Sequence, residues 1–174
     1  MKPMYIETER MTITQFDETM IEQVHLNSLD EANRRFVPDE VFETVEKARE
    51  VVEWLMSAYE GDEGPFVYPM ILNSGENIGY VQAVPFRDGF EIGYHVAGDF
   101  AGKGYATEAV SAFLPVIMDK LGIDRIWGDA CAENGASRRV LEKCGFVLEY
   151  EGMGEYQGTE RPIALYSYRE EAQH

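Results

Sequence analysis

Cysteine and histidine are scarce in this 174-residue chain, which has two cysteines and three histidines. Neither type shows the paired spacing of metal ligands, so no metal site is expected. Cys131 and Cys144 both lie in stretches with apolar periodicity. This setting favours two small buried side chains over a disulfide or a reactive thiol.

Long apolar runs are also missing. The longest apolar stretch, 110–118, is interrupted by Pro115 and is far too short to cross a bilayer. The first ten residues, MKPMYIETER, contain no apolar core of a signal peptide. We therefore expect a cytoplasmic protein that is not bound to a membrane.

Basic residues are few: 15 Lys and Arg stand against 32 Asp and Glu, for a net charge of −17. Such a surface repels phosphate backbones, which argues against nucleic acid as a partner. It attracts cationic substrates such as amines. The alternative is that the excess of acidic residues only keeps the protein soluble. A hydrophobic content of 45% is enough for the core of one domain spanning residues 1–174.

The order of apolar patterns predicts an α+β fold with a mixed, mostly antiparallel sheet of about seven strands and about four helices. Helices are expected near 20–29 and over 43–60, 105–121 and 136–144. Strands are expected over 5–16, 66–72, 77–84, 90–96, 124–132, 146–152 and 161–170. Short turns join the three strands between 66 and 96 in hairpin fashion.

The loop GDFAGKGYA, residues 98–106, has more glycines than a turn requires and precedes a helix. Glycines there let backbone N–H groups surround an anion, which the helix dipole also favours. The pattern is not that of a P-loop, because no Ser or Thr follows Lys103. A dinucleotide fingerprint would need glycine where Thr107 stands, so a nucleotide-dependent oxidoreductase is disfavoured.

Two blocks of sequence, GYHVAGDFAGKGYATEAV and IWGDACAENGASRRVLEKCGF, resemble the GNAT superfamily of acyl-CoA-dependent N-acetyltransferases. The similarity is closest to the branch that acetylates ribosomal-protein N-termini. In the first block the family has a [QR]-x-x-G-x-[GA] loop, and this chain departs from it at Ala101. In the second block, Asn134, Ser137, Gly145 and Phe146 match the branch. The Ala101 departure implies weaker cofactor binding.

The resemblance implies that acetyl-CoA is the cosubstrate. Backbone amides of the loop would hold its pyrophosphate, and its pantetheine arm would pair with the backbone of the preceding strand. Asn134 would cap its helix and touch the cofactor. The implied cofactor-binding residues are Tyr94, Val96, Gly102, Lys103, Gly104, Tyr105, Ala106 and Asn134.

Acetyl transfer needs an unprotonated amine and a proton for the departing thiolate. Glu91 matches the family position of a general base, with a solvated strand carboxylate as the alternative. Many family members have a tyrosine as the acid where Leu141 stands, so Ser137 is the candidate here. His95 is either a proton relay or an ordinary strand histidine, and the second reading is favoured.

These residues predict an acetyltransferase that acts by direct attack in a ternary complex. The acceptor pocket is expected between the two early helices and the hairpin at 149–162. Its expected carboxylates, Asp30, Glu31, Glu149, Glu151 and Glu155, suggest a cationic peptide N-terminus or small amine. The alternative is a non-catalytic acyl-CoA-binding module of the same fold. Either would be a monomer or a homodimer.

Overall fold

The computed structural model describes residues 3–156 and 158–170. Eight strands, five α-helices and three short 3-10 helices follow one another along these residues. The strands are β1 (Ile6–Glu7), β2 (Met11–Ile13), β3 (Phe66–Leu72), β4 (Asn77–Phe86), β5 (Gly89–Val96), β6 (Arg125–Cys131), β7 (Val147–Tyr156) and β8 (Thr159–Arg169). The helices are η1 (Glu18–Met20), α1 (Ile21–Ser28), α2 (Glu31–Phe36), η2 (Pro38–Glu40), α3 (Val45–Ala58), η3 (Gly98–Phe100), α4 (Tyr105–Leu121) and α5 (Gly135–Lys143).

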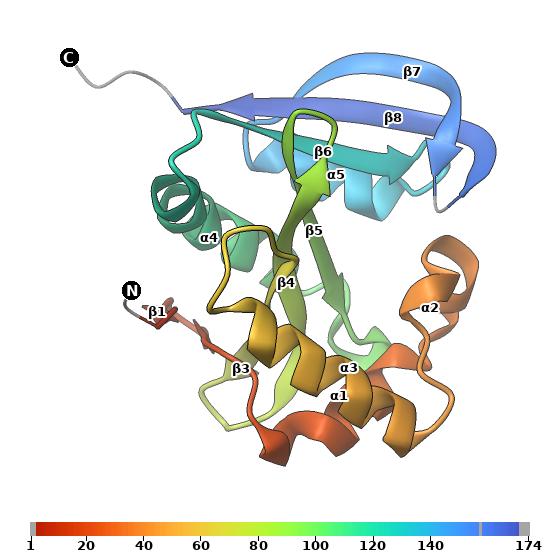
Figure 1. Cartoon of the computed structure of the whole chain (residues 1–174). Helices are drawn as coiled ribbons and strands as arrows, with labels where there is room; N and C mark the ends of the chain where they lie inside the picture. Colours follow the sequence, from red (N-terminus) through yellow and green to blue (C-terminus); the bar gives the residue numbers. More distant parts are fainter. Residues whose placement is uncertain (1–2, 157, 171–174) are drawn as a thin grey trace.

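All eight strands form one sheet in the order β1-β2-β3-β4-β5-β6-β8-β7. Every neighbouring pair is antiparallel except β5 and β6, which are parallel. The parallel pair is short, because only Glu91↔Trp127 and Ile92↔Gly128 are in register. Beyond these residues the strands diverge, and β6–β8 turn away from β3–β5 (Figure 1). The predicted α+β fold with a mixed, mostly antiparallel sheet is confirmed.

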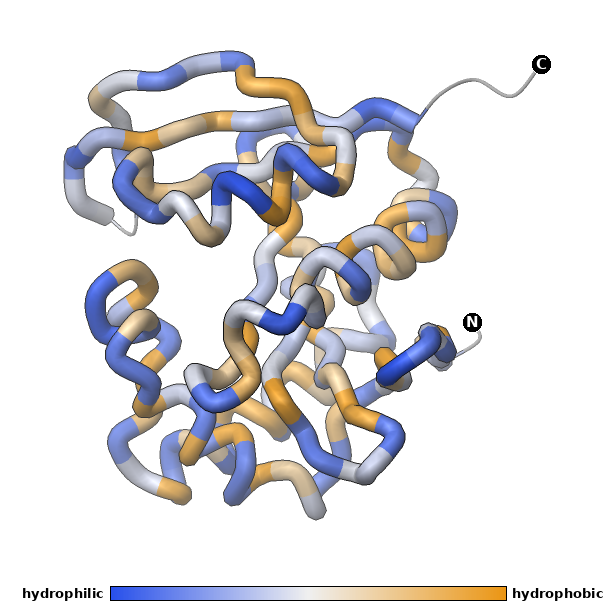
Figure 2. Tube along the Cα trace, turned by 180° about the vertical axis from the view of Figure 1, so that it is seen from behind, coloured by the Kyte–Doolittle hydropathy of each residue, from blue (hydrophilic) through white to orange (hydrophobic). Residues whose placement is uncertain are grey.

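Helices cover both faces of the sheet. On one face, α4 buries Val110, Phe113 and Ile117 in the main core with residues of the central strands. On the other, α1 and α3 form a second cluster through Ile21, Val52 and Leu55. The central strands accordingly carry long hydrophobic stretches, whereas the peripheral turns are mostly hydrophilic (Figure 2).

Three features differ from the sequence prediction. The single strand expected over 5–16 is a hairpin, since the Thr8 N–H donates to Met11 C=O (2.9 Å) and turns the chain without glycine or proline. Helix α2 was not predicted; it is one and a half turns long, and Asp30 caps it by accepting from the Ala32 N–H. The three 3-10 helices were also missed. Within the described residues, no helix is both long enough and apolar enough to cross a membrane.

Candidate functional site

The glycine loop between β5 and α4 has the shape of an anion cradle. Gly102 and Gly104 both have positive φ, at 76° and 82°, which favours glycine. Gly104 is the N-cap of α4 and has no side chain to occupy the helix end. Within the described part of the chain, no protein acceptor bonds to the backbone N–H groups of residues 102–106. These donors and the helix dipole fit a pyrophosphate.

The last residues of β5 offer a free strand edge beside this loop. The N–H of Ala97 donates to Ile78 C=O of β4 at 2.8 Å. Because backbone groups alternate between the two edges of a strand, those of Tyr94 and Val96 face the β6 side. β6 no longer pairs with β5 at this level. An extended arm such as pantetheine can therefore add here as a strand, as the sequence predicts for both residues.

A cavity of about 400 Å³ opens on the α1/α3 face where β5 and β6 part. Four carboxylates from three elements line it: Glu91 of β5, Asp39 and Glu40 of η2, and Asp129 of β6. Glu40 accepts a hydrogen bond from the Tyr80 hydroxyl. Asp129 Oδ1 is buried and has no partner among the described residues. The lining of the chamber is thus acidic.

Burial raises the pKa of Glu91, Asp129 and Glu40, and repulsion from neighbouring carboxylates adds to this at Glu91 and Glu40. Desolvation, followed by the charges of Asp129 and Glu40, raises the pKa of Glu91 to about 8. Desolvation also raises the pKa of Asp129 to about 6 and raises the pKa of Glu40. A carboxyl whose pKa lies near that of an amine can exchange a proton with it at little cost. Glu91 therefore has the electrostatics of a general base.

The N-terminus of α5 meets β5 through a tyrosine and a serine that both line the cavity. Tyr94 Oη donates to Ser137 C=O (2.6 Å) and lies 2.9 Å from Ser137 Oγ. Asn134 caps the helix, its Oδ1 accepting from the Ser137 N–H at 3.2 Å. Leu141 is 2% exposed and packs beside Gly128, so it belongs to the core. Because Tyr94 gives its hydrogen to the Ser137 carbonyl, the Ser137 hydroxyl donates to Tyr94 Oη and has to rotate to donate to a ligand.

His95 lines the same cavity two residues beyond Glu91 but is bonded elsewhere. Its Nε2 lies 3.3 Å from Asn27 C=O and 3.9 Å from Asp30. Burial lowers the pKa of His95, which favours the neutral ring. This contact with the end of α1 gives the histidine a structural partner, in keeping with the reading of an ordinary strand residue.

Gly93 lies between Glu91 and His95 on β5 and lines the same cavity. A Cβ built on Gly93 would lie 2.6 Å from Nε2 and 2.9 Å from Cγ of Gln82. The space above this glycine is therefore filled by the Gln82 side chain of β4. Glycine at this position thus leaves room for Gln82, which also lines the cavity. Sequence patterns alone do not place this neighbouring strand.

The cavity has the walls expected for the acceptor pocket but different carboxylates. Residues of α1, α3 and β7 line it, including Asn27, Trp54 and Tyr156. None of the five acidic residues expected from the sequence, namely Asp30, Glu31, Glu149, Glu151 and Glu155, lines the cavity. Three of them are engaged elsewhere, with Asp30 capping α2, Glu149 accepting from Ser167 and Glu151 paired with Arg138.

The carboxylates that do line the cavity gave different signals in the sequence. Asp129 is a lone acid within the apolar alternation of IWGDACA, a pattern that could have marked it. Glu40 lies on a 3-10 turn that follows no periodic pattern, so nothing in the sequence marked it. Among the described residues, no group of three or more His, Cys, Asp or Glu side chains is arranged to hold a metal ion.

Comparison with known proteins agrees with this geometry. The chain is 29% identical over 149 residues to YnaD of Bacillus subtilis, an uncharacterised N-acetyltransferase, with 84% of each chain covered. Its fold matches a GNAT-family acetyltransferase structure from Bacillus anthracis at a TM-score of 0.82 and 27% identity, covering 95% and 98% of the two chains. RimL, a ribosomal L7/L12 alpha-N-protein acetyltransferase solved with coenzyme A, shares the fold at a TM-score of 0.80 and 18% identity, over 95% and 98%.

The sequence pattern of the acetyltransferase (GNAT) domain matches residues 10–147, which include the cradle, Glu91 and Ser137. This match covers most of the chain and agrees with the resemblance in the glycine loop and in the helix that Asn134 opens. The chain belongs to the GNAT acetyltransferase family.

Proposed function

We propose that this protein transfers an acetyl group from acetyl-CoA to a primary amine by direct attack in a ternary complex. The observation that carries the proposal is Glu91, a partly buried carboxyl with a pKa of about 8, at the point where β5 and β6 part. The free edge of β5 leads from this point to the cradle at residues 102–106. Donor and acceptor would meet there without a covalent enzyme intermediate.

Acetyl-CoA is assigned to the cradle and to the gap between β5 and β6. The amides of residues 102–106 would hold the pyrophosphate, and the backbone of Tyr94 and Val96 the pantetheine arm. Asn134, which opens α5, would lie against the same arm. The fold relative RimL was solved with coenzyme A, which supports this assignment.

The acceptor is assigned to the acidic chamber. Glu40 and Asp129 flank Glu91, and their negative charge favours a substrate that carries positive charge, such as a small amine or a peptide N-terminus. Tyr80, Tyr156 and Trp54 add aromatic surface, on which cationic groups also bind. The chain's net charge of −17 would help such a substrate to approach.

The two proton transfers are assigned to groups on two sides of the cavity, Glu91 and Ser137. Glu91 takes a proton from the substrate ammonium, so that the amine nitrogen attacks the thioester carbonyl. The N–C bond forms, the C–S bond breaks, and the sulfur leaves with the bonding electron pair. The nitrogen, which became cationic on attack, releases its second proton to solvent. The Ser137 hydroxyl rotates from Tyr94 Oη to that sulfur and gives it a proton, while Tyr94 stays bonded to the Ser137 carbonyl. The serine regains its proton from solvent.

Two measurements test the function. Thermal unfolding in the presence of CoA, acetyl-CoA or NAD should show stabilisation by the CoA species alone, at about 2.7 kcal/mol for a ligand at 100 times its Kd. Thiol release from acetyl-CoA with a panel of peptides, polyamines and other small amines should identify an acceptor. Binding of CoA without thiol release for any amine would favour the non-catalytic acyl-CoA-binding module. Stabilisation by NAD alone would contradict both.

Asp129→Asn should raise KM for the amine about tenfold, because the variant removes a charge whose Oδ1 has no protein partner. KM for acetyl-CoA should stay unchanged. Glu155→Gln is the matched control, since Glu155 is exposed and does not line the cavity. An equal effect of the two variants would show that overall charge, not the chamber, attracts the acceptor.

Ser137→Ala should lower kcat about 10²-fold, the low end of acid–base contributions, with little change in either KM. The bond from Tyr94 to the Ser137 carbonyl does not depend on the side chain, so the fold should be kept. Ser74→Ala, on the turn between β3 and β4, serves as the control. Steady-state thiol release measures both variants. An unchanged kcat for Ser137→Ala would remove the serine from the mechanism.

A further inference from the structure

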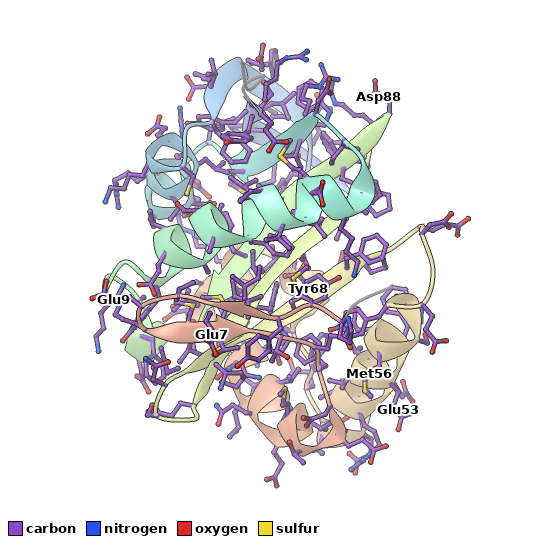
Figure 3. The ribbon with its side chains drawn as sticks, turned by 90° about the vertical axis from the view of Figure 1, so that its left-hand side faces the viewer. Glu7, Glu9, Glu53, Met56, Tyr68 and Asp88 are labelled. Carbon is purple, nitrogen blue, oxygen red and sulfur yellow. The ribbon has the colours of Figure 1, made fainter. Side chains whose placement is uncertain are left out.

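Arg10, which lies directly before β2, reaches the cofactor loop 93 residues further along the chain. Its Nη1 donates to Lys103 C=O at 2.9 Å, and its guanidinium lies over the Tyr105 ring, 4.2 Å from the centroid. Nη2 lies against Gly104, 3.4 Å from where a Cβ would stand. The hairpin that carries Arg10 runs along α4, with Glu9 near the N-terminal end of that helix (Figure 3).

Glu108, in the first turn of α4, keeps this guanidinium in place. Arg10 Nε donates to Glu108 Oε1 at 2.6 Å, and the Arg10 backbone N–H donates to Oε2 at 3.0 Å. The Thr8 hydroxyl also donates to Oε2, at 2.6 Å. A half-exposed ion pair contributes little by itself. These several bonds instead give the guanidinium one orientation, in which Nη1 meets the loop.

The hydrogen bond from Arg10 to the Lys103 carbonyl fixes the orientation of a whole peptide group. Lys103 C=O and Gly104 N–H belong to the same planar peptide and point in opposite directions. Holding the carbonyl toward Arg10 therefore directs the Gly104 N–H away from Arg10. Glycine at φ 82° permits this peptide to rotate, because no Cβ restricts it. An outside contact is needed to hold one orientation.

We infer that Arg10 is a positioning residue for the cofactor loop, which aims the Gly104 amide at the pyrophosphate of acetyl-CoA. The inference rests on the proposed function, in which residues 102–106 bind that group. Arg10 acts through the Lys103–Gly104 peptide, and Glu108 neutralises its charge locally. Its fork of donors, not its charge alone, is what the loop requires.

The test compares Arg10→Gln and Arg10→Lys with the wild type. Arg10→Gln should raise KM for acetyl-CoA and Kd for CoA about tenfold, the scale of one charge-assisted hydrogen bond. Kcat and KM for the amine should stay within about twofold. Arg10→Lys keeps the charge, but its ammonium cannot donate to the Glu108 carboxylate and to the Lys103 carbonyl at the same time. It should therefore resemble Arg10→Gln. Lys47→Gln removes the same charge from an exposed pair on α3 and should change none of these constants.

The outcomes separate this inference from the proposed function. Full affinity for CoA in Arg10→Lys would overturn it, because charge would then suffice. Unchanged CoA affinity in Arg10→Gln would overturn it as well. A fall in kcat together with a similar rise in both KM values would overturn it too, because that result would indicate a general structural role. If the wild type itself fails to bind CoA, the proposed function fails first, and this inference fails with it.

Discussion

Glu91→Gln should lower kcat by about 10²- to 10³-fold while leaving the affinity for CoA unchanged. Glutamine keeps the size of the side chain but cannot accept the proton of the ammonium. Since the pKa of Glu91 is raised to about 8, wild-type kcat/KM should increase with pH up to about 8 and then level off. This dependence should be absent from the residual activity of the variant. Thiol release across pH measures both.

The same substitution should stabilise the protein. The pKa of Glu91 in the folded state, about 8, lies above its ordinary value of 4.5. Between these values the folded protein retains a proton that the unfolded chain has released. Wild-type stability therefore falls as pH rises through this window, and Glu91→Gln removes that loss. At pH 8 the variant should melt about 5 °C above the wild type.

Glu53→Gln is the control for both measurements. Glu53 is exposed on α3 and points outward (Figure 3). The chemical change is the same, but no proton transfer and no buried charge are involved, so activity and melting temperature should both match the wild type. A pH–rate profile that Glu91→Gln leaves unaltered would show that Glu91 is not the base. A variant less stable than the wild type at pH 8 would show that the carboxylate is stabilised where it lies.

The opposite effects of Glu91→Gln on rate and stability have one cause. A general base at neutral pH needs a raised pKa, and here burial and two neighbouring carboxylates supply it. As pH rises through 8, the ionised Glu91 meets the repulsion of Asp129 and Glu40 in the free protein. A cationic acceptor would relieve this repulsion on binding. The negative charge of the chamber thus destabilises the protein without substrate and favours the binding of a cationic substrate.

Local patterns predicted what depends on local structure. Helix α4 runs from Tyr105 to Leu121 as expected, because apolar residues recur at helical spacing between two glycines. Those glycines, Gly104 and Gly122, both adopt the left-handed conformation at the ends of the helix. The alternation along β5 likewise placed Glu91 and His95 on the face opposite Ile92, and they line the cavity.

Contacts between distant segments were not predictable in this way. Glu40, Glu91 and Asp129 come together only after η2, β5 and β6 are assembled. Arg10 and Glu108 are 98 residues apart, and in the sequence each is an ordinary surface charge. For the same reason, none of the acidic residues predicted for the acceptor site lines the cavity. Membership in an acidic segment says little about which carboxylate faces a cavity.

Gly79→Ala should unfold or strongly destabilise the protein, although Gly79 bears no catalytic group. A Cβ at this position would lie 1.9 Å from the carbonyl oxygen of His95 and 2.8 Å from its carbonyl carbon. Both atoms belong to the backbone of the paired strand, so β4 and β5 would have to separate. The expected cost is about 3–5 kcal/mol, or a fall in melting temperature on the order of 10 °C.

Gly89→Ala is the matched control, because Gly89 begins β5 in open space with nothing within 4 Å of its Cβ position. It should melt within about 2 °C of the wild type. A similarly small change in Gly79→Ala would contradict the close approach of the two strands. If Gly79→Ala folds, its CoA affinity should also fall, because Gly79 pairs with Val96 at the end of β5 that is assigned to the pantetheine arm. The glycine would then serve the cofactor site through the spacing of two strands.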